Sequence, residues 1–206
     1  MPLWLWVSLG LGVGYLLLGG SGGGTRPGST SQGSVSARTD ADFQKLWQVA
    51  NDLGADPKVL GLILFEESGM DPGAWNSFNC VGCNQFCPGT YEGYVSVSRE
   101  EYVTWSMAQQ LDPIGRYWAD KPKGGLDTAR DLFWLSLWPK TWKPHADRSA
   151  VVVDNPAVVR ANQNIAPGSS VITAGDVDDY LDTYKSSPGW QLALQRIAAT
   201  DPSGVA

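Results

Sequence analysis

Apolar residues after residue 38 recur at helical spacing and predict a first amphipathic helix. Thr39 precedes the pattern, Asp40 and Asp42 would lie in its first turn, and Gly54 stands where a glycine ends a helix. The apolar positions fall at i, i+3, i+4, i+7 and i+10, which places them on one face: Phe43, Leu46, Trp47, Ala50 and Leu53.

A second helix is predicted directly afterwards, and it is apolar almost throughout. Asp56 and Pro57 form an N-cap and first-turn pair, and the helix is expected to end at Gly69 or Pro72. A helix that is apolar on all sides is typical of the centre of a domain. Its last turn nevertheless carries two adjacent acids, Glu66 and Glu67.

Helical patterns also cover residues 98–119, 126–138 and 173–184. Ser98 with Glu101, and Thr173 with Asp176, have the spacing of capping boxes. The only strand-like run is Ala150–Val153. We therefore expect one mainly α domain over residues 39–206.

The first 20 residues hold no charge and form an apolar, glycine-containing run with Trp4, Trp6 and Tyr15 near its ends. At about 1.5 Å per residue, residues 2–20 would reach roughly 28 Å, close to the thickness of a bilayer core. We predict a transmembrane anchor over 1–20. A signal peptide is the alternative, but no basic residue precedes the run, as one would in a signal peptide. Arg26 and Arg38, which follow it, are too few to decide its orientation.

Residues 21–38 are rich in Gly and Ser and are predicted to be a flexible linker. All 21 Asp and Glu, and all but two of the 15 Lys and Arg, lie in residues 39–206, so the domain is acidic. Such a domain has no broad cationic face for phosphates, which argues against nucleic acid as a main partner.

Glu66 and Glu67 are the most informative residues of the chain. Both would lie at a helix C-terminus and against apolar neighbours, and both conditions disfavour a negative charge. A carboxyl whose pKa is raised in this way can donate a proton at neutral pH. Spacing alone does not separate the two, and a solvated pair of terminal acids is the alternative interpretation.

The surrounding motifs single out Glu67. Glu67-Ser68-Gly69, then Pro72 and Asn76, are followed by the segment Gly82-Cys83-Asn84-Gln85-Phe86-Cys87-Pro88-Gly89-Thr90. This order resembles the goose-type lysozyme and lytic transglycosylase superfamily, whose pattern is Glu-Ser-Gly and then Gly-Leu-x-Gln-Phe-x-Pro-x-Thr. The further resemblance, to phage-type domains, spans most of residues 55–182: Gln110-Leu111-Asp112 with Tyr117, Asp131-Leu132-Phe133 up to Pro139, Asn162, and Ile172-Thr173 with Asp176.

The resemblance implies a lysozyme-like fold and a site without metal or cofactor. Glu67 takes the place of the family's catalytic acid and base. Ser68, Gln85 and Thr90 match positions that line the cleft or close the motif, and Asn162 is counted with them as substrate-binding. Trp75 is a further substrate-binding candidate that does not come from the resemblance. An aromatic face stacks on a pyranose, and this residue lies close to both motifs in the sequence. Trp142 is a weaker candidate.

The sequence also departs from the family. Cys83, Asn84 and Cys87 replace small or aliphatic residues, and Val159 stands where a tyrosine usually precedes the late asparagine. Substitutes for that tyrosine are Tyr91, Tyr94 and Tyr117, which the sequence does not rank. A hydrolase would need a second carboxylate. The nearest candidates for it are Asp71 and Glu92.

Cys80, Cys83 and Cys87 leave several states open. Structural zinc prefers four ligands, and the only histidine, His145, is distant in sequence and expected to be exposed. In an oxidising compartment we expect one disulfide, Cys80–Cys87 or Cys80–Cys83, and one free thiol. In a reducing one, three buried thiols are expected.

These observations predict a membrane-tethered lytic transglycosylase that cleaves the bond between N-acetylmuramic acid and N-acetylglucosamine in peptidoglycan. The expected partners are glycan strands and the membrane, together with proteins of a phage virion or of a secretion apparatus. The alternatives are a lysozyme-type hydrolase of the same bond, or a non-catalytic glycan-binding or structural module. A metal- or redox-sensing membrane protein built on the cysteines is a third and weaker interpretation.

Overall fold

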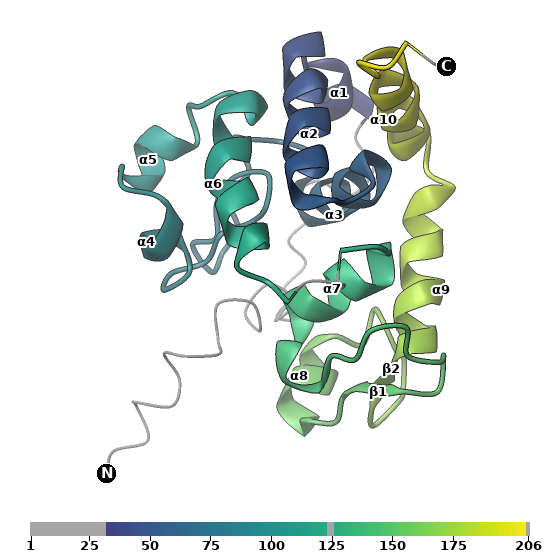
Figure 1. Cartoon of the computed structure of the whole chain (residues 1–206). Helices are drawn as coiled ribbons and strands as arrows, with labels where there is room; N and C mark the ends of the chain where they lie inside the picture. Colours follow the sequence, from purple (N-terminus) through teal and green to yellow (C-terminus); the bar gives the residue numbers. More distant parts are fainter. Residues whose placement is uncertain (1–31, 123–125, 205–206) are drawn as a thin grey trace.

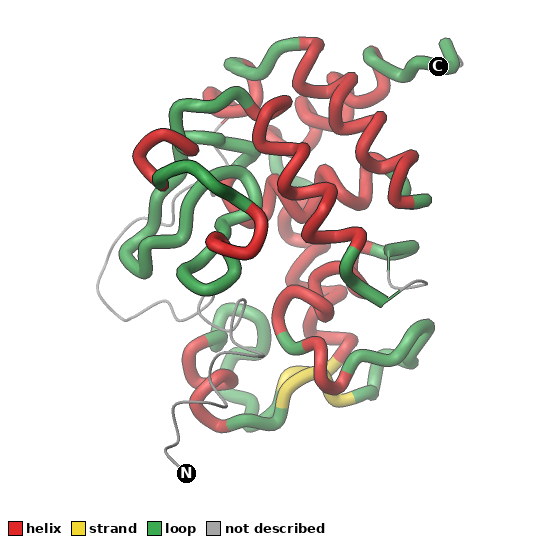
Figure 2. The backbone as a smooth tube through the Cα atoms, turned by 60° about the vertical axis from the view of Figure 1, so that its left-hand side comes forward, coloured by secondary structure: helices red, strands yellow, loops and turns green. Residues whose placement is uncertain are grey.

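The computed structural model describes residues 32–122 and 126–204, and in these the protein is mainly α-helical, as predicted. Figure 1 shows the helices, and Figure 2 shows the two short strands lying at the end of the molecule opposite the main group of helices. The helices are α1 (Gln32–Ser36), α2 (Asp40–Leu53), α3 (Pro57–Ser68), α4 (Tyr91–Tyr94), α5 (Arg99–Tyr102), α6 (Met107–Ala119), α7 (Ala129–Leu137), α8 (Pro156–Ala161), α9 (Ala174–Lys185) and α10 (Pro188–Ala199).

Helix α3 holds the centre of the fold. It packs against α2, α7, α9 and α10, which explains why its sequence is apolar on nearly every side. Asp56 caps it by accepting a hydrogen bond from the amide of Lys58, and Gly69 ends it in a left-handed conformation. The two predicted boundaries of this helix are confirmed.

The last part of the predicted linker is ordered. Residues 32–36 form α1, which packs against α10, and the side chain of Val35 is fully buried. One apolar residue among serines and glycines is enough to attach this short turn to the core, so the domain begins before residue 39. The rest of the linker and the anchor predicted over 1–20 lie outside the described residues. Among the helices of the described part, none has both the length and the apolarity to cross a bilayer.

The single helix predicted over 98–119 is wrong. Ser98 caps only the four-residue α5, and Ser106 starts α6 with a full capping box in which it exchanges hydrogen bonds with Gln109. A second serine with its own partner at N3 is a stronger start signal than the apolar periodicity that bridges the two helices. The break creates a loop that carries Trp105.

The predicted strand-like run becomes β1 (Val151–Val153), which pairs antiparallel with β2 (Ile172–Thr173). Thr173 then caps α9 through the predicted capping box with Asp176. One threonine thus ends a strand and starts a helix, which fixes the register of α9. Figure 1 shows α9 running from this pair of strands toward α10 along one side of the molecule.

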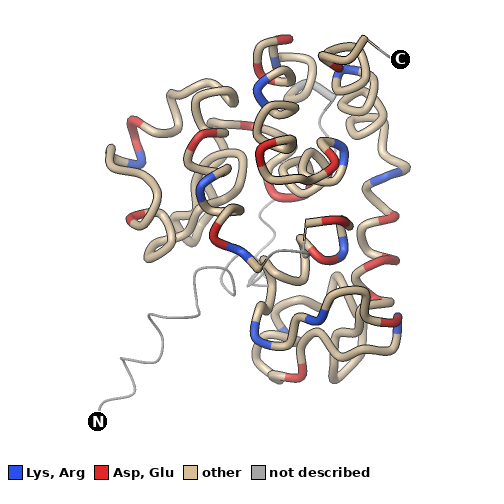
Figure 3. Tube along the Cα trace, viewed as in Figure 1, with Lys and Arg blue, Asp and Glu red and all other residues tan. Residues whose placement is uncertain are grey.

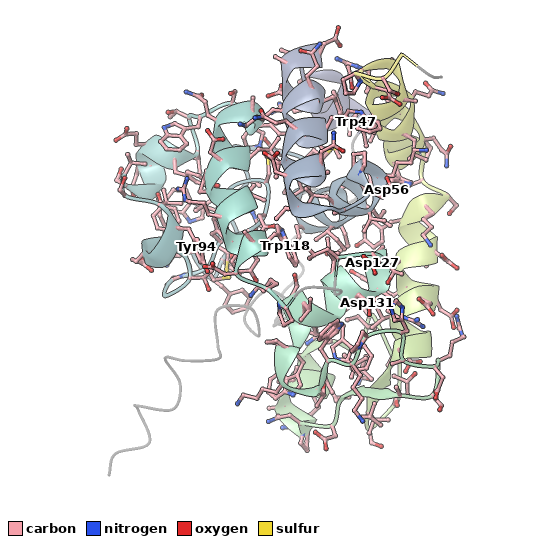
Figure 4. The ribbon with its side chains drawn as sticks, in the orientation of Figure 1. Trp47, Asp56, Tyr94, Trp118, Asp127 and Asp131 are labelled. Atoms are coloured by element: carbon pink, nitrogen blue, oxygen red, sulfur yellow. A yellow bond between two sulfur atoms is a disulfide. The ribbon has the colours of Figure 1, made fainter. Side chains whose placement is uncertain are left out.

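Tryptophans fill the core much as expected. Trp118 and Trp134 are fully buried, while Trp47, Trp105 and Trp138 are half-buried against the core. Trp118 belongs to α6 and is labelled near the lower end of that helix in Figure 4. Its indole N–H donates to the side-chain oxygen of Asn84, 3.2 Å away, so Asn84 of the glutamine motif has a structural partner. In the view of Figure 3, Lys and Arg are scattered along the chain and do not gather on one face.

Candidate active site

Glu67 lies in the last turn of α3, where the chain reverses at Gly69. The amide of Gly69 donates to the carbonyl of Phe65 and that of Met70 to the carbonyl of Leu64, which closes the helix end. The Glu67 side chain is half-buried, and its Oε2 is buried without a hydrogen-bond partner among the described residues. A buried carboxylate oxygen without a donor strongly disfavours the ionised form.

The environment raises the pKa of Glu67 well above its usual value. Burial is the larger cause, and the neighbouring Glu66 is the second. The helix dipole acts in the same direction because the C-terminus carries partial negative charge. A carboxyl in this state is suited to donate a proton near neutral pH.

Glu66 has a different environment from Glu67, although the two are adjacent. Its side chain is buried, and its Oε1 accepts a hydrogen bond of 2.6 Å from the hydroxyl of Tyr180 on α9. That hydroxyl lies 3.0 Å from the hydroxyl of Tyr184, one turn further along the same helix. Neither tyrosine was predicted to be a site residue. Their i, i+4 spacing on one helical face was the available signal.

Ser68 braces the site from within and is fully buried. Its single hydroxyl proton is shared between the carbonyl oxygens of Leu64 and Cys83, 3.1 and 3.0 Å from Oγ, and Oγ accepts from the amide of Asp71 at 3.1 Å. The hydroxyl is thus already engaged in three bonds inside the protein. In the structure, Ser68 joins α3 to the glutamine motif, and the sugar contact remains a prediction.

Gln110, also missed as a site residue, fixes the same motif from α6. Its Oε1 accepts from the amide of Cys83 at 2.9 Å, and its Nε2 donates to the carbonyl oxygens of Pro72 and Tyr102 at 2.9 Å each. The side chain is fully buried, so every one of these bonds is sheltered from water. Ser68 on α3 thus bonds the carbonyl of Cys83, and Gln110 on α6 bonds its amide.

The other predicted substrate-binding residues lie in distinct settings. Gln85 is buried in a left-handed conformation (φ 45°), and its Nε2 donates to the carbonyl of Gly82 at 2.9 Å. Thr90 precedes α4 and is half-buried, without a side-chain capping bond. Trp75 is 39% exposed, unusual for an indole, and its N–H donates to the side-chain oxygen of Asn79. Asn162 is fully buried at the end of α8, and its Oδ1 has no partner among the described residues.

The structure separates the proposed tyrosine substitutes. The hydroxyls of Tyr91 and Tyr94 donate elsewhere, to the carbonyl of Val97 and to Asp120. Tyr117 is buried, and the pKa of its hydroxyl is raised by that burial first and by the charge of Glu67 second. Of the three candidates, Tyr117 alone is electrostatically linked to Glu67.

Both candidate second carboxylates are held by local contacts. Asp71 accepts from the amide of Gly73 at 2.9 Å. Glu92 is exposed and pairs with Arg99. Trp142, the weaker sugar candidate, is half-buried and donates to Asp131 of α7, which Figure 4 labels.

Cys80 and Cys87 form a disulfide, one of the two pairings expected in an oxidising compartment. Cys83 is a free thiol, and burial raises its pKa. No group of three or more potential ligands that could hold a metal ion is found in residues 32–122 and 126–204. The disulfide closes the loop that carries Gln85, between Trp75 and Thr90.

Removing this disulfide should destabilise the loop measurably. Closing a loop of this size restricts the unfolded chain by about 2–3 kcal/mol in the chain-entropy treatment. We expect the double variant Cys80→Ser/Cys87→Ser to lose about that much free energy of unfolding in urea titrations. Adding a reductant should destabilise the wild type and leave the double variant unchanged; an equal response of both would contradict the bond.

The buried state of Glu67 also predicts a pH-dependent stability effect. Its pKa is raised in the folded protein, so the folded state binds the proton more tightly and loses stability as pH rises above the ordinary value for Glu. Glu67→Gln removes that loss. We expect the melting temperature of the variant to exceed that of the wild type at pH 7, because the variant has no buried carboxyl to ionise.

This difference in melting temperature should shrink toward pH 4, where Glu67 takes up a proton in the unfolded as well as the folded wild type. Thermal melts across this pH range check it. A constant difference at all pH values would show that the substitution acts through packing and not through the proton.

Comparison of the chain with protein-family models, with curated proteins and with solved structures gave no match.

Proposed function

We propose that this protein is a membrane-tethered lytic transglycosylase of peptidoglycan, with Glu67 as its acid and base. The observation that carries the proposal is the Glu67 carboxyl itself. It has a buried oxygen without a donor and a pKa raised by burial and by Glu66. The order of the motifs along the chain supports the same assignment, and the partly exposed Trp75 offers an aromatic face for a pyranose.

The reaction uses one carboxyl twice. Glu67 donates its proton to the glycosidic oxygen between N-acetylmuramic acid and N-acetylglucosamine, and the bond from that oxygen to C1 breaks. The C6 hydroxyl of the muramyl residue then attacks C1, and the Glu67 carboxylate takes the hydroxyl proton. The product is a 1,6-anhydro sugar, no water is consumed, and Glu67 regains its proton. A second carboxylate is needed only where water must be activated.

The anchor and linker belong to the proposal as the means of holding the acidic domain near its substrate. The domain carries an excess of Asp and Glu, so it has no general electrostatic attraction for an anionic wall. A membrane segment and a flexible tether would supply the local concentration instead. A phage virion during genome entry, or a bacterial secretion apparatus, are settings that need such local opening of the wall.

The test is product analysis by mass spectrometry. Purified full-length protein is incubated with peptidoglycan sacculi, and the soluble fragments are identified. Anhydromuropeptides released by the wild type but not by Glu67→Gln would establish the proposal. Reducing-end products would assign a lysozyme-type hydrolase. Binding to sacculi without release, unchanged in Glu67→Gln, would assign a glycan-binding module.

A further inference from the structure

Two adjacent glutamates at the end of α3 have different surroundings. Glu66 accepts a hydrogen bond from Tyr180 of α9, whereas Oε2 of Glu67 is buried without a partner among the described residues. Successive residues of a helix are about 100° apart, which accounts for the divergence. The pair therefore places one carboxyl among hydroxyl donors and the other in a site where one of its oxygens has none.

We propose that Glu66 is a positioning residue: held as an anion by the hydroxyls of α9, it keeps on Glu67 the one proton that the two glutamates share. This inference rests on the proposed function, in which Glu67 must be protonated before it can act. It assigns to Glu66, Tyr180 and Tyr184 a role that the family resemblance does not contain.

The hydrogen bonds decide which glutamate ionises first. The charge of Glu66 raises the pKa of Glu67, so the two carboxyls do not ionise independently and one retains its proton as the other loses it. A donor at 2.6 Å stabilises the ionised form of Glu66, while the buried Oε2 of Glu67 has no donor among the described residues. Glu66 is therefore the anion of the pair, and Glu67 is the acid.

Tyr184 supports the same arrangement. Tyr180 has a single hydroxyl proton, which it donates to Glu66. In the contact of 3.0 Å between the two tyrosines, Tyr184 must then be the donor and Tyr180 the acceptor. A chain of donors that all point toward Glu66 strengthens each bond by polarisation.

The charged groups on the other elements packed against α3 are bonded elsewhere. From α7, Arg130 pairs with Asp178, and Asp131 accepts from Thr128 and Trp142. On α2, Asp42 caps Thr39 and accepts from the amide of Ala108. The remaining ion pairs of α2 and α10 are Lys45–Asp112 and Arg196–Asp40, and the titratable side chain in direct contact with Glu66 is that of Tyr180 on α9.

The first test is the pH profile of glycan release by the full-length protein. Glu66→Gln removes the neighbouring negative charge, so Glu67 should lose its proton more readily. The alkaline limb of kcat/KM should therefore move to lower pH by about one unit. Tyr180→Phe should lower the rate near neutral pH by about tenfold, because the proton then resides partly on Glu66. In the Glu66→Gln background, Tyr180→Phe should move the limb no further.

Glu100→Gln is the matched control, since it removes one negative charge from the exposed surface of α5 and should leave the profile in place. A limb that stays in place in Glu66→Gln, or that moves equally in Glu100→Gln, would overturn the proposal. If Tyr180→Phe moves the alkaline limb further in the Glu66→Gln background, the tyrosine has a separate, structural role.

A second measurement does not depend on turnover. The side-chain carboxyl of Glu67 can be titrated by carbon NMR in the labelled full-length protein, with Glu67→Gln for assignment. A titration midpoint that is lower in Glu66→Gln supports the positioning role even where sacculi are not cleaved. Failure of the proposed function can thus be told apart from failure of the positioning role. A midpoint unchanged by Glu66→Gln refutes the role even in an active enzyme.

Discussion

Glu67→Gln should lower the rate of anhydromuropeptide release by about 10²–10⁴-fold, the range that a positioned general acid contributes. Gln has nearly the same shape as Glu but holds no transferable proton, so both the protonation of the leaving oxygen and the deprotonation of the C6 hydroxyl are lost. The loss should appear mainly in kcat, because the substitution leaves the binding contacts in place. Steady-state release of fragments from sacculi measures it.

The fold of the variant must be checked in the same preparation. The variant should be at least as stable as the wild type at pH 7, for the reason given above for the buried carboxyl. A more stable but inactive protein is the signature of a catalytic group kept in an unfavourable environment. If Glu67→Gln retains full activity, Glu67 is not the acid, and its raised pKa is a structural consequence of burial alone.

Several helices with strong start signals were predicted from the sequence. Thr39, Asp56 and Thr173 each precede a helix that begins where expected, because each cap satisfies free amides locally. Helix α10 was missed although Ser187 and Pro188 have the same form and Trp190, Ala193 and Ile197 follow at helical spacing.

The residues of the candidate site also differ in whether the sequence could predict them. Glu67 could be found because it stands in an ordered set of motifs and at the end of an apolar helix. Tyr180 and Gln110 could not, since they come from helices 114 and 27 residues away from their partners Glu66 and Cys83. A hydrogen bond across such separations depends on how the helices pack. For Ser68, the sequence identified the motif but not the direction of the side chain, whose hydroxyl turns inward to the carbonyls of Leu64 and Cys83.

Gly82→Ala should be among the most destabilising small substitutions in the described part of the chain. Gly82 has φ +78°, which an L side chain adopts at a cost of about 1–3 kcal/mol. A Cβ there would also lie 2.5 Å from the Tyr102 ring and 2.6 Å from Oε1 of Gln110. Both neighbours are fully buried and cannot move aside freely. Overpacking of this kind adds about 1–3 kcal/mol.

Gly54→Ala is the matched control, because Gly54 has φ +70° but nothing within 4 Å of the added Cβ. It should show the backbone cost alone, so Gly82→Ala should lose about 1–3 kcal/mol more in urea unfolding. The excess has a functional consequence, since the Gln110 oxygen that the new methyl group displaces is the acceptor for the Cys83 amide. Activity of Gly82→Ala should therefore fall even at temperatures where the variant is folded, whereas Gly54→Ala stays active. Equal losses of stability for both variants would mean that the loop shifts without strain, and that Gln110 does not hold the glutamine motif in place.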